Sequence, residues 1–173
     1  MDEKVLLAAT LVYPVTETHV LLAIKQKKIG RGCWNGYGGG IEPSDVDIPS
    51  AALRELAEES GGLTGTVDAL HHVAVVDFHN RKADGECFTC RVHIFLLTRH
   101  IGTATSTPEM VDPTWFAKEE LPLGKLMPAD PFWLPHVLAG ETFYAEAWYG
   151  PFQLTLEQPV RIQLMTPEAL HRL

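Results

Sequence analysis

Four charged side chains lie close together just before a pair of glycines in the stretch ALRELAEESGG: Arg54, Glu55, Glu58 and Glu59. On a helix the three glutamates stand at i, i+3 and i+4, which predicts one patch on the side away from the helix's apolar stripe, with side chains about 5–6 Å apart. Like charges at this spacing cost roughly 0.2–0.5 kcal/mol per pair, and the helix dipole disfavours anions in the last turn. A solvated acidic face is one interpretation. The other interpretation is a binding site for a divalent cation, because carboxylate oxygens are suitable ligands for Mg²⁺ and Mn²⁺.

A glycine-rich stretch, WNGYGGGIE (Trp34–Glu42), comes shortly before the acidic segment. Glycine permits positive φ angles and lets a ligand approach the backbone closely. Free N–H groups in such a loop can hold phosphate oxygens, and its carbonyls can bind a metal. A tight turn would also explain the glycines, but the acidic patch that follows favours a ligand site.

The acidic segment is predicted to be a helix that begins after Asp47 and ends at Gly61. Asp47 suits the N-cap, Pro49 the first turn, and Gly61 with Gly62 a left-handed C-cap. The residues of the apolar stripe recur at helical spacing and are Ala52, Leu53, Leu56 and Ala57.

The remaining elements are mostly strands, recognised by β-branched and aromatic residues. A second helix is expected over Pro131–Ala139, and Gln153–Leu156 is expected to close a hairpin with Thr142–Trp148. The other expected strands are Val5–Val15, His19–Lys25, Val67–Phe78, Phe88–Thr98, Pro113–Ala117 and Val160–Leu164. This order predicts an α+β fold in which a mixed sheet has room for one helix on each face. Residues 165–173 are expected to form a loose tail.

Length and composition predict one globular domain over residues 1–173. The formal charge of −8 argues against electrostatic binding of nucleic acid or an anionic membrane over a broad surface. The N-terminus does not resemble a signal peptide, and no apolar run reaches transmembrane length. Cys87 and Cys90 form a lone C-x-x-C without a second ligand pair, and the odd cysteine count indicates reduced thiols and a cytoplasmic protein.

The glycine stretch and the acidic segment together resemble the Nudix box, G-x5-E-x7-R-E-U-x-E-E-x-G-U, where U is aliphatic. Here the box spans about residues 39–62, from Gly39 through RELAEESG (Arg54–Gly61). Asp45 stands where Glu is usual, the spacer is one residue longer, and Gly62 occupies the aliphatic position. The resemblance implies a Nudix hydrolase with an α/β/α sandwich, a mixed sheet between helices.

Segments outside the box resemble the MutT-type oxidised-purine nucleoside triphosphatases over roughly Thr10–Trp148. The resemblance implies metal ligands at Gly39, Glu55, Glu58 and Glu59, for Mg²⁺ with Mn²⁺ as the alternative. It assigns catalytic roles to Glu55, Glu58, Arg54 and Glu109, and it leaves open which glutamate is the base. Arg54 would brace a carboxylate, and Glu109 would assist metal or water. A solvated loop acid is the alternative for Glu109.

The same resemblance implies five substrate contacts, Thr10, Ile29, Asn35, Asp130 and Trp133, and the charge pattern adds Lys25 as a sixth. Lys25 belongs to the one dense basic run of the chain and is expected to meet phosphate or base. The alternative for Trp133 is a structural role in the hydrophobic core. The chain has MPAD (Met127–Asp130) where these enzymes show W-P-D-D, so Met127 and Ala129 replace a Trp and an Asp. This departure predicts weak discrimination between oxidised and ordinary purines.

The expected function is Mg²⁺-dependent hydrolysis of nucleoside triphosphates to nucleoside monophosphate and pyrophosphate. The expected base is a purine, with oxidised purines such as that of 8-oxo-dGTP included. The alternatives are the same chemistry on a nucleotide sugar or dinucleotide, and a non-catalytic nucleotide-sensing Nudix-fold module. The protein is expected to act as a monomer or weak dimer, without a nucleic-acid polymer or membrane as partner.

Overall fold

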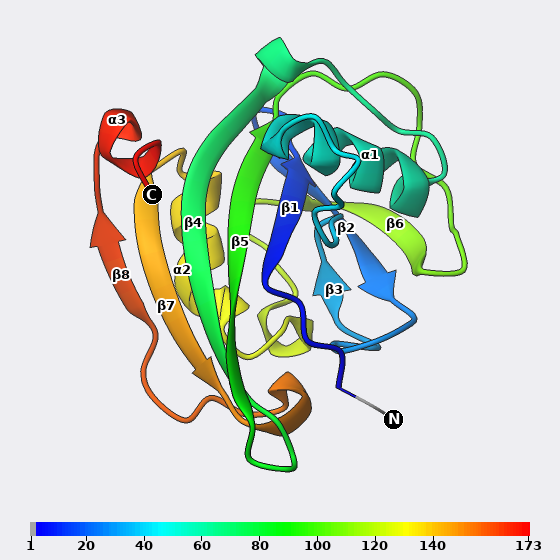
Figure 1. Cartoon of the computed structure of the whole chain (residues 1–173). Helices are drawn as coiled ribbons and strands as arrows, with labels where there is room; N and C mark the ends of the chain where they lie inside the picture. The colour runs from blue at the N-terminus through cyan, green and yellow to red at the C-terminus, as the bar shows by residue number, and fades with distance from the viewer. Residues whose placement is uncertain (1–2) are drawn as a thin grey trace.

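The strands form two sheets in the computed structural model, which describes residues 3–173 (Figure 1). The larger sheet is mixed and contains, in spatial order, β1 (Ala8–Pro14), β5 (Cys87–Leu97), β4 (Leu70–Arg81), β7 (Phe143–Tyr149) and β8 (Arg161–Leu164). The smaller sheet is antiparallel and contains β3 (Trp34–Asn35), β2 (His19–Lys25) and β6 (Met110–Ala117). In the larger sheet β1 runs parallel to β5 and β4 runs parallel to β7. The sequence predicted one mixed sheet, whereas the strands divide between these two.

Helix α1 (Ile48–Ser60) has both of the predicted ends. The Asp47 side chain accepts a hydrogen bond from the Ser50 N–H at 2.8 Å, and Pro49 occupies the first turn. Gly61 closes the helix in the left-handed conformation with φ 73°. Because these caps are local, their residue types were enough to predict the position of the helix.

The larger sheet lies between α1 and α2 (Asp130–Leu138). Neighbouring residues of a strand point to opposite faces, so Val12 of β1 packs with Leu56 of α1 while Tyr13 packs with Trp133 and Leu134 of α2. Residues of β5 alternate between the same two cores. The predicted α+β class, an α/β/α sandwich around a mixed sheet, is confirmed.

The C-terminal part of the chain differs from the prediction. Gln153–Leu156 is not a strand; a short 3₁₀ turn, η3 (Pro151–Gln153), replaces it, and the hairpin partner of β7 is β8. The last residues are not loose, since they form α3 (Pro167–Leu170), with Leu170 only 1% exposed. Arg91 Nη1 also donates to the Leu173 carbonyl at 2.8 Å.

Two further short 3₁₀ turns are present: η1 (Val67–Ala69) lies between α1 and β4, and η2 (Leu123–Lys125) lies between β6 and α2. Cys33, Cys87 and Cys90 are free thiols. Within residues 3–173, every helix is too short or too polar to cross a membrane.

Candidate active site

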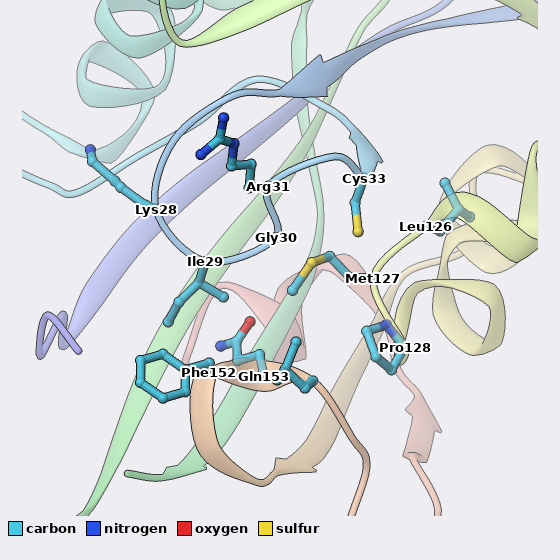
Figure 2. A pocket seen from close by; sticks show the side chains of 11 residues that line it. Lys28, Ile29, Gly30, Arg31, Cys33, Leu126, Met127, Pro128, Phe152 and Gln153 are labelled. Atoms are coloured by element: carbon cyan, nitrogen blue, oxygen red, sulfur yellow. The ribbon is translucent and has the colours of Figure 1, made fainter. Parts of the chain in front are cut away.

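All six predicted substrate contacts line one cavity of about 560 Å³. They reach it from separate elements: Thr10 from β1, Lys25 from β2, Asn35 from β3, Ile29 from the loop between β2 and β3, and Asp130 with Trp133 from α2. The lining also contains the glycine loop, Glu59, Asn80 and Phe152. A neighbouring cavity of about 510 Å³ shares Ile29, Met127 and Phe152 with it (Figure 2).

Two polar atoms in the lining have no hydrogen-bond partner among the described residues, namely Thr10 Oγ1 and Trp133 Nε1. Buried polar groups are nearly always paired, so an unpaired donor in a cavity wall fits a ligand. Asn35 Oδ1 accepts from the Gly36 N–H at 2.8 Å and from the Tyr13 hydroxyl at 3.2 Å. That arrangement leaves the NH₂ group of Asn35 for a ligand.

Asp130 is the acidic group of the α2 wall and is 3% exposed. Burial raises the pKa of its carboxyl group to about 8, and the opposing charge of Lys25 lowers it in part. At pH 7 the group is therefore mostly neutral and can both donate and accept a hydrogen bond. Met127 lines the cavity too, whereas Ala129 is fully buried and is not part of the lining.

The glycines of the loop are needed because other atoms approach them closely. A Cβ on Gly38 would lie 1.9 Å from the Thr10 carbonyl oxygen, which is backbone, whereas one on Gly39 would lie 2.5 Å from Glu55 Oε2 and would displace that carboxylate. Neither residue has a positive φ, so close approach, and not backbone handedness, accounts for them. The Gly39 carbonyl accepts from the Thr10 N–H at 2.9 Å and keeps a second lone pair.

The acidic residues of α1 point in different directions. Glu59 is only 9% exposed, and its Oε2 accepts from the Gly38 N–H at 3.0 Å. The Glu58 side chain is 61% exposed, and Glu55 lies against Gly39. The prediction of a single patch away from the apolar stripe is wrong for Glu59, because the glycine loop covers that side of the last turn.

The acidic groups around Glu59 favour binding of a cation. Burial raises the pKa of Glu59 to about 7; the Gly38 N–H and Lys25 lower it, while Glu55 and Glu109 raise it further. Burial likewise raises the pKa of Glu55. Among residues 3–173, no three His, Cys, Asp or Glu side chains already have a metal-binding arrangement. The mutual repulsion of Glu55, Glu59 and Glu109 nevertheless gives a divalent ion a favourable place, since carboxylate oxygens are suitable donors.

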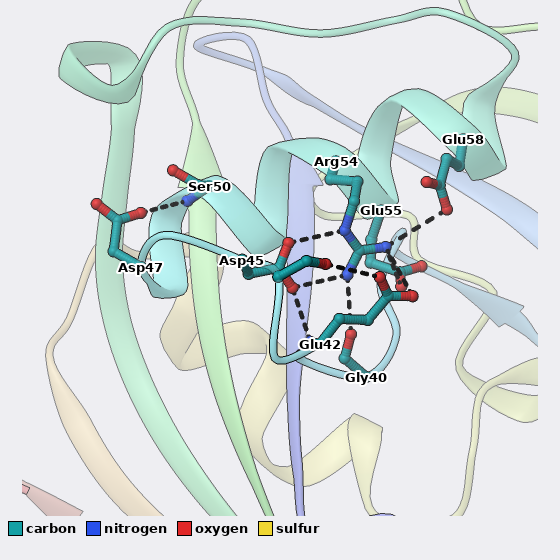
Figure 3. Close-up of polar contacts among 9 residues, drawn as sticks. Gly40, Glu42, Asp45, Asp47, Ser50, Arg54, Glu55 and Glu58 are labelled. Carbon is teal, nitrogen blue, oxygen red and sulfur yellow. Dashed lines mark hydrogen bonds and ion pairs between the residues drawn. The ribbon is translucent and has the colours of Figure 1, made fainter.

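Arg54 joins the helix to the loop before it (Figure 3). Its Nε and Nη2 atoms donate to the two carboxylate oxygens of Asp45 at 2.8 and 2.9 Å. Nη1 donates to Glu55 Oε1 at 2.9 Å, and Nη2 also donates to the Gly40 carbonyl at 3.1 Å. The hydrogen bonds from Arg54, together with one from the Glu42 N–H, lower the pKa of Asp45 to about 2. Asp45 therefore pairs with Arg54 although a Glu is usual at its position.

We expect Arg54→Lys to lower kcat/KM by at least tenfold. An ammonium group cannot make the planar two-pronged contact with Asp45 while also bracing Glu55 and the Gly40 carbonyl, so Glu55 would lose its fixed position. Steady-state kinetics with thermal melting checks this result. A kcat/KM within twofold of wild type would leave Arg54 as an ordinary surface charge.

The comparisons with known proteins agree with this arrangement. The model of the NUDIX domain family matches residues 5–137. The chain belongs to the Nudix hydrolase family. It is 37% identical to the oxidized purine nucleoside triphosphate hydrolases of Mus musculus and Danio rerio, in each case over 78% of this chain and 81% of the relative. It is also similar to the crystal structure of the MutT mutator protein from Bacillus halodurans, with TM-score 0.75 and 26% identity over 91% of this chain and 98% of the other.

Nudix hydrolases generally use divalent metal ions, consistent with the carboxylates at the glycine loop. Sequence reasoning missed several residues of the cavity lining of this Nudix hydrolase, including Phe78 and Asn80 of β4 and Phe152 and Gln153 of η3. The alternating pattern of β4 could have indicated that Phe78 and Asn80 share a face. Phe152 and Gln153 carry no comparable signal.

Proposed function

We propose that this Nudix hydrolase converts purine nucleoside triphosphates, oxidised purines included, to nucleoside monophosphate and pyrophosphate with Mg²⁺, or with Mn²⁺ as the alternative. The observation that carries the proposal is the continuity of the cavity. One lining contains both the glycine loop with Glu59 and the group of Asn35, Asp130 and Trp133. A triphosphate and a base can therefore occupy the two regions at once. The names of the curated relatives support the same substrate class.

In the proposed reaction, water attacks a phosphorus atom of the triphosphate, and the bond between the α- and β-phosphate units breaks. The oxygen of water enters the product that contains the attacked phosphorus, the bridging oxygen stays with the other product, and the two products are nucleoside monophosphate and pyrophosphate. Glu55 or Glu58 takes the proton of the attacking water. The charge of Lys25 lowers the pKa of both Glu59 and Asp130, which supports a role for Lys25 in binding a phosphate or the base. A bound Mg²⁺, held by Glu55, Glu58, Glu59 and the Gly39 carbonyl, would supply charge neutralisation and water activation.

The base region supports recognition of a purine edge. Neutral Asp130 offers a donor and an acceptor, and Asn35 offers its NH₂ group. Because Ala129 is not part of the lining and Met127 has no aromatic face, one carboxyl group serves this region. We expect hydrolysis of 8-oxo-dGTP and dGTP at comparable efficiency. We further propose a cytoplasmic monomer or weak dimer that acts on free nucleotides without a nucleic-acid polymer or membrane partner.

Chromatographic separation of the products formed from a nucleotide panel, with Mg²⁺ and with a chelator, tests the proposal, because a nucleoside triphosphate gives nucleoside monophosphate and pyrophosphate whereas a nucleotide sugar or a dinucleoside polyphosphate gives other products. The panel contains dGTP, 8-oxo-dGTP, dATP, dCTP, a nucleotide sugar and a dinucleoside polyphosphate. We expect turnover to depend on the metal and the purine triphosphates to be hydrolysed faster than the other compounds of the panel. Preference for the sugar or dinucleotide would favour another Nudix chemistry. Nucleotide binding without turnover of any compound would indicate a sensor module.

A further inference from the structure

One wall of the substrate cavity lies outside the part of the chain that the family model matches, which ends at residue 137. This wall is the η3 turn between β7 and β8. Phe152 and Gln153 line both neighbouring cavities, so they form part of the partition between them. Figure 2 shows the Phe152 side chain beside Ile29, with the Gln153 amide next to it and directed toward the side of Met127.

The backbone of this turn is strained. Phe152 has φ 57° and ψ 18°, and Gln153 has φ 54°, so two consecutive residues with side chains adopt the left-handed conformation. L-residues disfavour this conformation because Cβ approaches the following carbonyl oxygen. Such strain persists where surrounding contacts hold it, and it concentrates at ligand sites.

Glu3 supplies one of the contacts that hold the turn. Its Oε1 atom accepts from the Phe152 N–H at 2.6 Å, and its Oε2 atom accepts from the Ala83 N–H at 2.8 Å. A single carboxylate thus ties the N-terminal segment to η3 and to the connection between β4 and β5. Glu3 itself is part of the cavity lining.

Asn80 holds the side chain of Gln153. Gln153 Nε2 donates to Asn80 Oδ1 at 2.8 Å, and the Asn80 amide donates to the Phe78 carbonyl at 2.9 Å. Asn80 is 7% exposed, so this support is inside the protein. Within residues 3–173, the second N–H and the oxygen of the Gln153 amide remain for a ligand. They form a donor beside an acceptor, which matches the edge of a nucleobase.

We propose that Phe152 and Gln153 are specificity-determining residues for the base, and that Glu3 is a positioning residue for both. The Phe152 ring provides a flat apolar face for a planar base, and the Gln153 amide hydrogen-bonds with the base's edge. The occupant is the purine base of a nucleotide whose phosphates lie toward the glycine loop. The inference rests on the proposed function in that the same cavity holds the reacting triphosphate.

Phe152→Gly isolates the contribution of the ring, because glycine adopts the left-handed conformation without a Cβ clash and keeps the turn. We expect the KM for purine triphosphates to rise on the order of 5- to 100-fold, with kcat within threefold and the melting temperature unchanged or raised. Asp112→Gly is the matched control, since Asp112 is exposed, has φ 54° and lies outside the cavity lining. It should leave KM unchanged.

Glu3→Ala should raise KM in the same direction as Phe152→Gly, and the double variant should be no worse than the stronger single variant. That non-additivity separates positioning of the turn from an independent contact. Glu17→Ala, which removes an exposed acid from another loop, should leave KM unchanged. Additive effects of Glu3→Ala and Phe152→Gly would remove Glu3 from the proposal.

Calorimetric binding of GMP and CMP, without metal, gives a readout that does not depend on turnover. We expect wild type to prefer GMP, and Phe152→Gly and Gln153→Ala each to weaken GMP binding at least fivefold. If wild type hydrolyses no triphosphate but shows these losses, the proposed function fails and this inference stands. If wild type hydrolyses purine triphosphates while both variants match it in KM and in GMP affinity, the inference is overturned and the proposed function stands.

Discussion

Replacing Glu58 with glutamine is expected to lower kcat on the order of 10²- to 10⁴-fold, the range for loss of a proton-transfer group. The free energy of unfolding should change by less than about 0.5 kcal/mol, because an exposed ion pair contributes little. The Glu58 side chain is 61% exposed and pairs with Arg54 Nη1 at 3.5 Å. Its charge also raises the pKa of Glu55, so its removal relieves repulsion. Steady-state kinetics and urea unfolding measure the two effects.

Glu42→Gln is the matched control for this substitution. The Glu42 side chain is 57% exposed and lies 3.8 Å from the same Arg54 nitrogen, so both variants remove one exposed carboxylate facing Arg54. Of the two, only Glu58 lies on α1 and is itself a predicted metal ligand. We expect Glu42→Gln to stay within threefold of wild-type kcat. Equal losses in the two variants would mean that Glu58 acts only through Arg54, and near-normal turnover by Glu58→Gln would remove it from the catalytic set.

The elements that depend on local chemistry were predictable from the sequence. The strand His19–Lys25 has the predicted bounds, and α1 has the predicted caps at Asp47 and Gly61. Each of these features is set by residues within one turn or one alternation of the chain. The orientation of Glu59 was not predictable in this way, since helical spacing says nothing of the glycine loop that covers it.

Most of the candidate site was predictable from family resemblance, which assigned five contacts distant in sequence; the basic run added Lys25, and all six line one cavity. Their environment came only from the structure. The effect of the Lys25 charge on the pKa of Asp130, for example, joins residues of β2 and α2 that are more than 100 positions apart in the sequence. The wall formed by Phe152 and Gln153 was missed for a physical reason. Consecutive left-handed residues without glycine have no sequence signature, and long-range hydrogen bonds to Glu3 and Asn80 hold them.

The largest expected effect of pH on stability concerns Asp130. Burial raises the pKa of its carboxyl group from 3.8 to about 8 in the folded protein, so between these values the folded chain keeps a proton that the unfolded chain has lost. The stabilisation of the folded state that comes from this retained proton is fully present below about pH 4 and is lost as pH rises to about 8. The slope for one such group is up to about 1.4 kcal/mol per pH unit. Asp130→Asn removes this titration.

Urea unfolding from pH 5 to pH 9 measures the difference in free energy between Asp130→Asn and wild type. The variant should gain relative stability with rising pH and level off above about pH 8. The groups around Asp130 are Lys25, which opposes the shift, and Tyr13, Tyr149 and Cys33, whose pKa values are raised and which stay protonated through most of this range.

Asp68→Asn is the control: hydrogen bonds with Thr66 and Arg99 lower the pKa of Asp68, so its contribution changes only below about pH 4. Its difference curve should be flat from pH 5 to pH 9. A flat curve for Asp130→Asn as well would mean that Asp130 is ionised in the folded protein, and the neutral donor assigned to the base region would then be wrong.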